Sequence, residues 1–309
     1  MTCTLALHGG AGTIRAANMA PGELQAHHDG LRTALQAGHR VLAAGGPALD
    51  AVTVAVVALE DDPLFNAGRG AVFTAAGVQE MDAAAMDGAT LRAGAVAGIR
   101  GPRNPILAAR AVMEHSRHVL LAGEGAVAFL RAHGVAFADD AYFHTPRRWD
   151  ALQRVLAAQG TTKDDADRHG TVGAVACDAH GNLAAATSTG GMTGKLPGRI
   201  GDSPLPGAGT WADATCALSA TGHGESFIRI AAGHELSARM RLAGDGLDAA
   251  AAAVMAALAA VGGDGGFVAV DRAGRVAMPF NSAGMYRGVM GADGVAHTGI
   301  HRDALQSRP

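Results

Sequence analysis

The sequence predicts an α+β fold in which antiparallel sheets are flanked by helices. Apolar segments with strand patterning come in pairs joined by tight turns, at 171–178 with 182–188 and at 266–271 with 274–280. Longer segments with helical spacing lie between these pairs and not after each single strand. Since a doubly wound parallel sheet alternates one strand with one helix, this order favours packed antiparallel sheets.

The composition is that of a globular protein that acts on a small substrate. Of 309 residues 49% are hydrophobic, and the formal net charge is only -3. Without a block of Lys and Arg or a long apolar run, we expect no nucleic-acid partner and no membrane partner. No signal-peptide pattern opens the chain, and the three cysteines are widely spaced, so we expect a cytoplasmic protein.

The first half of the chain is expected to combine short strands with longer helices. A strand at 4–7 runs into HGGAG at 8–12, which fits either a loop whose amides face a carbonyl or anion, or a tight turn. Beyond it the patterns predict helices at 22–44 and 48–60, a hairpin of 72–74 and 80–82 around Gly77, a strand at 93–99, and helices at 105–115 and 124–133.

Between 139 and 168 the periodicity fades, apart from a helical piece near 148–158. The polar run that follows predicts an exposed, mobile linker over about 159–170. Thr171 comes next and heads a strand; freed at a new N-terminus, it would have its own α-amino group as a base. The last third predicts a loop at 190–209, a strand near 215–220, and helices at 225–240 and 247–261.

Common catalytic signatures fail at decisive positions. The segment 190–195 suggests a phosphate-binding loop, but Leu196 stands where that motif needs Ser or Thr. A metal cluster on one helix would need a third ligand or an HExxH pattern, so a solvated face is the simpler interpretation of Glu114, His115 and His118. What remains is a set of hydroxyls, glycines and one charge pair, which spacing alone explains as strand threonines and a surface ion pair: Thr171, Thr187, Thr189, Arg199, Asp202, Thr221 and Gly222.

Several long sequence blocks favour a functional interpretation of these residues instead: HGGAG at 8, FNAGRGAVFT at 65, EMDAAAMDG at 80, HGTVGAVACD at 169, TSTGG at 187, GRIGDSPLPGAG at 198 and TGHGESFIR at 221. In this order the chain resembles the plant-type (class 2) asparaginase and isoaspartyl aminopeptidase family of N-terminal-nucleophile hydrolases. The resemblance covers nearly the whole chain and implies a four-layer αββα sandwich. It also implies hydrolysis of β-aspartyl dipeptides and L-asparagine through a β-aspartyl ester on Thr171.

The resemblance implies that the precursor cuts itself between Gly170 and Thr171. Gly170 has no Cβ to obstruct attack by the Thr171 hydroxyl on the preceding carbonyl. The products would be an α chain of 1–170 and a β chain of 171–309, together one structural domain, assembled as a dimer of αβ heterodimers.

By motif position the resemblance also assigns the other site residues. Thr189 would orient the nucleophile, and Thr221 with the Gly222 amide would form the oxyanion hole. Arg199 and Asp202 would clamp the α-carboxylate and α-ammonium groups of the substrate, with Asn66 and Gly224 at further substrate-side positions. His223 would either tune side-chain acceptance or lie outside the reaction as an exposed imidazole.

The resemblance implies no cofactor for catalysis, but a structural Na⁺ held by backbone carbonyls of Leu59, Glu60, Phe65 and Ala67. Two rival functions stay open. A glycosylasparaginase would share GRxGDSPxPGAG but has a different nucleophile block, and a non-catalytic binding protein would keep the clamp without cleaving its ligand.

Overall fold

The computed structural model describes residues 3–14, 19–20, 22–158 and 170–307, so most of the predicted linker at 159–170 lies outside the described residues. The strands are β1 Thr4–Gly12, β2 Met81–Asp87, β3 Ala93–Ile99, β4 Leu120–Ala122, β5 Val172–Cys177, β6 Leu183–Thr189, β7 Thr210–Ala212, β8 Cys216–Gly222, β9 Gly265–Asp271, β10 Val276–Ala277, β11 Gly284–Met290, β12 Ala296–Gly299 and β13 Gln306–Ser307. The helices are α1 Glu23–Ala43, α2 Ala48–Asp61, α3 Pro105–His115, α4 Gly123–Ala132, α5 Asp140–Phe143, α6 Pro146–Ala157, α7 Gly224–Ile230, α8 Ala232–Ala238 and α9 Leu247–Ala260, with short η2 Gly68–Gly70 and η3 Arg239–Ala243.

The described strands form two sheets, and their pairing is almost entirely antiparallel. The larger sheet has nine strands in the order β13-β12-β11-β1-β5-β6-β2-β3-β4, and the smaller has four in the order β10-β9-β8-β7. The predicted hairpin β5–β6 is confirmed, with Val172 opposite Ser188. One pair departs from the antiparallel prediction: β4 lies parallel to β3, because α3 carries the chain back between them.

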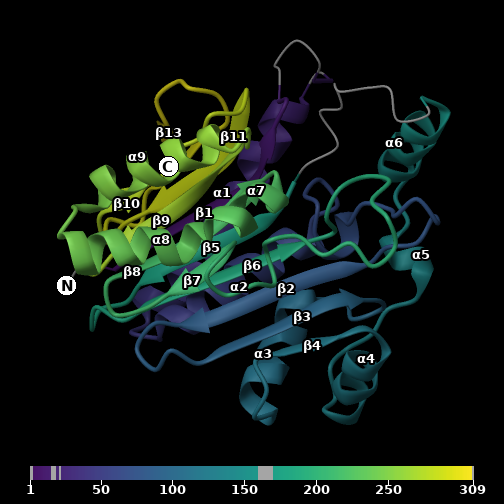
Figure 1. The fold of residues 1–309 in the computed structure, drawn as a ribbon, viewed down its shortest axis with the longest axis horizontal. Helices are drawn as coiled ribbons and strands as arrows, with labels where there is room; N and C mark the ends of the chain where they lie inside the picture. The colour runs from purple at the N-terminus through teal and green to yellow at the C-terminus, as the bar shows by residue number, and fades with distance from the viewer. Residues whose placement is uncertain (1–2, 15–18, 21, 159–169, 308–309) are drawn as a thin grey trace.

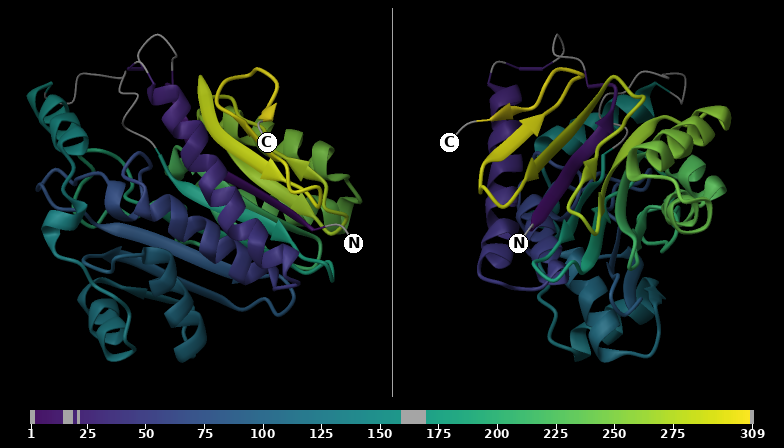
Figure 2. Two further views of the ribbon diagram at one scale, coloured as in Figure 1. Left: turned by 180° about the vertical axis from the view of Figure 1, so that it is seen from behind. Right: turned by 90° about the vertical axis from the view of Figure 1, so that its left-hand side faces the viewer.

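Apolar residues divide into three clusters that give the molecule its layers. One joins α1, α2 and α3 to the larger sheet, as with Leu35, Val52 and Leu7, and another joins α8 and α9 to the smaller sheet. The third lies between the sheets, where Val175 of β5 and Val268 of β9 belong to one cluster. Viewed along the sheets, the helices lie at the two outer sides with the strands between them (Figure 2). Figure 1 shows α8 and α9 over the smaller sheet.

Most predicted helices and strands are confirmed within a few residues, but three segments differ. HGGAG is neither a loop nor a turn; it continues β1, with an irregularity between His8 and Gly10. The segment 72–74 forms no hairpin with 80–82; Thr74 closes a turn through backbone hydrogen bonds with Gly77 and Val78 and makes an isolated bridge to Lys195. The helix predicted at 225–240 is divided at Ala231, whose φ of 48° is left-handed.

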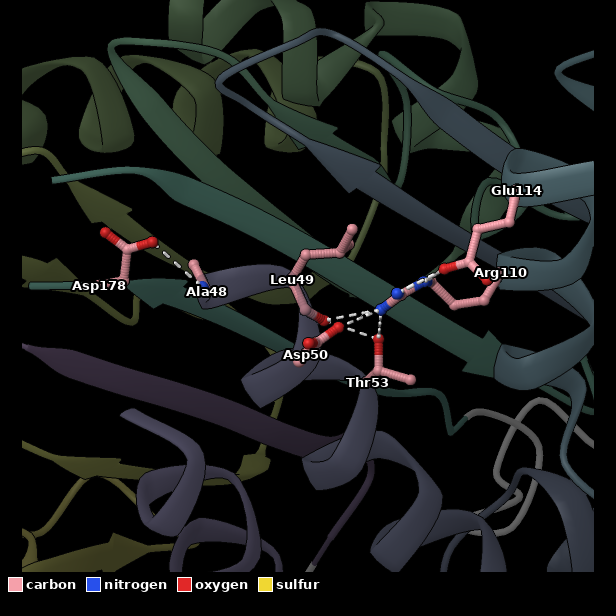
Figure 3. A network of polar contacts seen from close by, with 7 residues as sticks. All are labelled: Ala48, Leu49, Asp50, Thr53, Arg110, Glu114 and Asp178. Carbon is pink, nitrogen blue, oxygen red and sulfur yellow. Dashed lines mark hydrogen bonds and ion pairs between the residues drawn. The ribbon is translucent and has the colours of Figure 1, made fainter. Parts of the chain in front are cut away.

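Helices α2 and α3 are tied together by the guanidinium group of Arg110 (Figure 3). Its Nη1 donates to Asp50 Oδ1 at 3.0 Å and to Thr53 Oγ1 at 2.9 Å, and its Nε donates to Glu114 Oε1 at 2.8 Å. At the start of α2, the Ala48 amide donates to Asp178 in the β5–β6 turn at 3.3 Å. Glu114 is therefore a partner of Arg110 on a partly solvated face, as its pattern predicts.

None of the described helices combines the length and apolar character needed to span a bilayer.

Candidate active site

Thr171 lies at the head of β5, where its hydroxyl meets that of Thr189 at the end of β6. Because the two strands are antiparallel neighbours, the start of one lies beside the end of the other. Thr171 Oγ1 donates to Thr189 Oγ1 at 3.2 Å, and the Gly191 amide donates to the same oxygen at 2.9 Å. Thr189 has its own hydroxyl proton left to donate, and Gly170 O accepts it at 3.0 Å.

The carbonyl of Gly170, at the predicted cleavage bond, also accepts a hydrogen bond from Asn66. Asn66 Nδ2 donates to Gly170 O at 2.8 Å and to Gly191 O at 2.7 Å, while its Oδ1 accepts from the Val72 amide at 2.9 Å. These contacts fix the orientation of the side-chain amide. Asn66 was predicted on the substrate side, and the structure places its side chain on the Gly170 carbonyl, at the predicted cleavage bond.

One small cavity brings together the predicted nucleophile and the predicted clamp. Its walls include Thr171, Thr189, Arg199, Asp202 and Gly222, which come from the residue before β5, the ends of β6 and β8, and the loop between β6 and β7. Sequence spacing gave no reason to expect the loop residues at 199 and 202 beside the strand residue at 171. The fold produces that arrangement by returning the loop across the end of the larger sheet.

Arg199 is held by an acidic residue that the sequence analysis did not single out. Glu225 accepts from Arg199 Nε at 2.9 Å and from Nη2 at 2.8 Å, in a bidentate pair. This pairing fixes the guanidinium plane and leaves the Nη1 edge for a further carboxylate. Partial burial raises the pKa of the Glu225 carboxyl, but the hydrogen bonds and the charge of Arg199, together with a backbone hydrogen bond, outweigh it, so the pKa lies below its ordinary value. Glu225 lies next to Gly224 in the TGHGE run, which was the available sequence signal.

Asp202 is a buried carboxylate with one oxygen unused. Its side chain is 4% exposed, and among the described residues Oδ2 has no hydrogen-bond partner. Burial raises the pKa of the Asp202 carboxyl to about 7, although the positive charge of Arg199 opposes that shift. An unsatisfied buried carboxylate oxygen is costly, so this atom suits a cationic ligand group.

Thr221 and Gly222, the predicted oxyanion hole, lie at the end of β8. The Ala11 amide donates to Thr221 Oγ1 at 3.1 Å, which leaves the Thr221 hydroxyl proton to be donated elsewhere. Gly222 has a φ of 133° and lines the cavity beside Thr171. A Cβ at Gly222 would lie 2.5 Å from the Asp264 carbonyl oxygen, so only glycine fits there.

Gly224 and His223 border the clamp. A Cβ at Gly224 would lie 2.7 Å from Asp202 Oδ1 and 3.2 Å from Arg199 Nη2, so the missing side chain keeps the clamp open. His223 is 40% exposed, and its Nε2 lies 3.5 Å from Glu225 Oε2. The imidazole thus contacts the partner of Arg199, outside the walls of the cavity.

The loop predicted to bind sodium has donor atoms of suitable chemistry. The carbonyls of Phe65 and Ala67 each accept one backbone hydrogen bond, at 3.1 and 3.0 Å, and the Glu60 carbonyl faces Gly68, where a Cβ would lie 2.6 Å from it. A carbonyl oxygen has two lone pairs, so these groups retain capacity for a hard cation. The sodium ion itself stays a prediction.

Comparison with known proteins agrees with the chemistry that this geometry indicates. The family model described as asparaginase matches residues 1–300. The chain belongs to this asparaginase family. It is 51% identical to the isoaspartyl peptidase of Salmonella typhimurium over 97% of this chain and 98% of that protein. It is 49% identical to the isoaspartyl peptidase of Escherichia coli, over 97% and 96%, and 44% identical to the plant-type L-asparaginase of Thermococcus kodakarensis, over 90% and 93%.

Proposed function

We propose that this protein is a self-processing threonine hydrolase that cleaves β-aspartyl dipeptides and L-asparagine and releases L-aspartate. One observation carries the proposal: a single cavity holds the Thr171 hydroxyl and a pair of oppositely charged side chains, the partly exposed Arg199 and the buried Asp202. The pair complements a free α-carboxylate and α-ammonium group, and a β-aspartyl group carries both. Relatives that match nearly the full chain are isoaspartyl peptidases and a plant-type L-asparaginase, which supports the same reaction.

Self-cleavage would begin with attack of Thr171 Oγ1 on the Gly170 carbonyl carbon. The hydrogen bonds supply a proton route: the Thr171 proton passes to Thr189 Oγ1, and the Thr189 proton passes to Gly170 O. Asn66 Nδ2 stabilises the charge that develops on that oxygen. The C–N bond then breaks with proton transfer to the nitrogen, leaving an ester on Thr171, and water hydrolyses the ester to free the Gly170 carboxyl group.

Turnover would use the amine that self-cleavage creates. The neutral α-amino group of Thr171 takes the proton of its own hydroxyl, while Oγ1 attacks the β-carbonyl carbon of the bound substrate. The Thr221 hydroxyl and the Gly222 amide donate to the developing oxyanion. The proton goes to the leaving amine or ammonia, and water then hydrolyses the β-aspartyl ester.

The finer architecture belongs to the same proposal. The three apolar clusters support a four-layer αββα sandwich, with the α chain of 1–170 and the β chain of 171–309 in one domain. We also propose that two αβ units associate, as the family resemblance implies, and that the protein is cytoplasmic. A structural Na⁺ would be held by the carbonyls of Leu59, Glu60, Phe65 and Ala67.

Intact-mass analysis and paired assays test the proposal. Purified wild type should give two chains that separate at Gly170–Thr171, and should release aspartate from a β-aspartyl dipeptide and ammonia from L-asparagine. Thr171→Ala should stay a single chain without activity. A stable uncut wild type with full activity, or activity in Thr171→Ala, would contradict it.

A further inference from the structure

His8 contacts the nucleophile residue from the neighbouring strand, although the proposed reaction gives it no part. It lies on β1 opposite Gly173 of β5 and has no exposed surface. Its Nδ1 lies 2.9 Å from the carbonyl oxygen of Thr171, and its Nε2 lies 2.9 Å from Ser219 Oγ on β8 of the other sheet. We infer that His8 is a positioning residue that holds the backbone of Thr171 for catalysis. This inference rests on the proposed function.

The partners of His8 determine its protonation. A carbonyl oxygen only accepts, so the hydrogen between Nδ1 and Thr171 O must be on Nδ1. Burial lowers the pKa of His8 to about 3, with the Thr171 contact opposing the shift, so the ring is neutral near pH 7. Nε2 then carries a lone pair, and the Ser219 hydroxyl donates to it.

A chain of hydroxyls keeps Ser219 in that role. Since Ser219 uses its proton on His8, it accepts from Thr187 Oγ1 at 2.7 Å, and Thr187 in turn lies 2.6 Å from Thr210 Oγ1. All these side chains are buried between the sheets. These hydroxyls therefore favour the His8 tautomer that donates to Thr171, and they connect the imidazole to β6, β7 and β8.

Gly173 provides the space in which His8 and Ser219 meet. A Cβ on Gly173 would lie 2.7 Å from His8 Nε2 and closer still to Ser219 Oγ, so any side chain would separate them. The Gly173 position lies inside the GTVGAVA block, two residues after the nucleophile. A requirement for glycine at that position is what a dedicated His8–Ser219 contact predicts.

The contact gains importance once the chain is cut. Paired strand residues begin at Val172, so Thr171 lies outside the ladder with β6. Before cleavage Gly170 restrains Thr171 from the other side; afterwards the first restraint on its backbone is the peptide group whose oxygen His8 holds. Misplacement of a reacting group by about 1 Å can cost about 100-fold in rate.

Two substitutions separate the two hydrogen bonds of His8. In His8→Asn the amide nitrogen can occupy the place of Nδ1 and donate to Thr171 O, but the contact to Ser219 is lost. In His8→Gln the longer amide reaches the place of Nε2 and keeps the Ser219 contact, but loses the donor to Thr171. Both remove the imidazole from the same buried position, so each controls for the packing loss of the other.

Each variant is expressed as the full chain. The experiment measures its self-cleavage rate by intact mass, its thermal stability and, after cleavage, its kcat and KM on a β-aspartyl dipeptide. We expect kcat of His8→Gln to fall at least about 10-fold with KM within about 3-fold, because the clamp is untouched, and kcat of His8→Asn to stay within about 3-fold of wild type. Equal loss in both variants, in cleavage or in kcat, would overturn the inference, as would wild-type kcat in His8→Gln. A wild type that neither cuts itself nor hydrolyses the dipeptide would instead refute the proposed function.

Discussion

The two ends of the cavity differ in charge and in how completely their hydrogen bonds are formed. At the cleavage end, Thr171 and Thr189 line the cavity and Asn66 adjoins it through the Gly170 carbonyl; these side chains are neutral and already have partners. At the clamp end, Arg199 faces acidic groups, and Asp202 Oδ2 is buried without a partner in the described chain.

This difference indicates two separate tasks. At the cleavage end, the group that the proposed self-cleavage attacks is the Gly170 carbonyl of the chain itself, and only the hydrolysing water would come from outside. At the clamp end, a zwitterionic ligand of the proposed kind would supply an ammonium group for Asp202 and a carboxylate for Arg199. Perturbing each end should therefore change a different measurement.

Thr189→Val should have the largest effect and should act on self-cleavage. It removes one of the two donors to Gly170 O and the acceptor for the Thr171 proton, so we expect cleavage about 100- to 1,000-fold slower. Time-resolved intact mass of freshly purified precursor measures this rate. Ser188→Ala is the matched control, because that hydroxyl lies on the same strand but on its opposite face, and its cleavage should be unchanged.

Asp202→Asn should act on binding and leave self-cleavage intact. We expect KM for a β-aspartyl dipeptide to rise about 10- to 100-fold, with a smaller change in kcat, because the neutral amide no longer pairs with the ammonium group. Steady-state kinetics on the dipeptide and on an analogue without the α-amino group provide the comparison. A similar penalty on both substrates would place Asp202 outside the ammonium clamp.

The pH dependence of wild-type KM should report the same carboxyl group. Burial raises the pKa of Asp202 to about 7 in the free enzyme, so the group is protonated below that pH and KM should rise as pH falls from 7 to 5. At saturation, kcat should instead increase as the Thr171 amine loses its proton, near its usual pKa of about 7.7 to 8.0. If Asp202→Asn keeps the acidic rise in KM, another group is responsible.

Glu60→Gln should have the smallest effect. It tests whether the buried Glu60 carboxyl, which lies behind the cleavage end, is uncharged in the folded protein near pH 7. Glu60 lies on α2 and is fully buried against β6, and its Oε1 accepts a hydrogen bond from the Ile106 amide at 2.9 Å. Burial raises the pKa of its carboxyl to about 8, so the folded state disfavours ionisation. An unfolded Glu ionises near pH 4.5, so this group costs stability as pH rises from there to about 8.

Glu60→Gln removes that penalty while keeping an acceptor for Ile106. We expect its stability relative to wild type to improve by at least about 1 kcal/mol between pH 5 and pH 8, measured by denaturant unfolding at both values. An equal difference at the two pH values would mean that Glu60 does not titrate with the raised pKa.

Patterning predicted most of the elements, because their periods are local. Helices at 22–44 and 48–60 and the hairpin at 171–188 are confirmed, since their apolar spacing and turn residues agree with the final fold. HGGAG was harder to assign, because three glycines suggest a turn, whereas pairing with β5 and β11 holds it extended. Ala231 divides a continuous helical pattern, and an alanine side chain does not predict a left-handed φ.

The sequence by itself determined the family, the helices and hairpins, and the identity of Thr171, Thr189, Arg199 and Asp202 as candidates, because these follow from local periodicity and from ordered blocks. Three contacts became evident only from the folded chain: Asn66 donates to the Gly170 carbonyl, Glu225 anchors Arg199, and His8 reaches Thr171. Each of these contacts joins residues from different elements, and hydrogen bonds between such residues depend on sheet register and loop path. Those are set by packing of the whole chain.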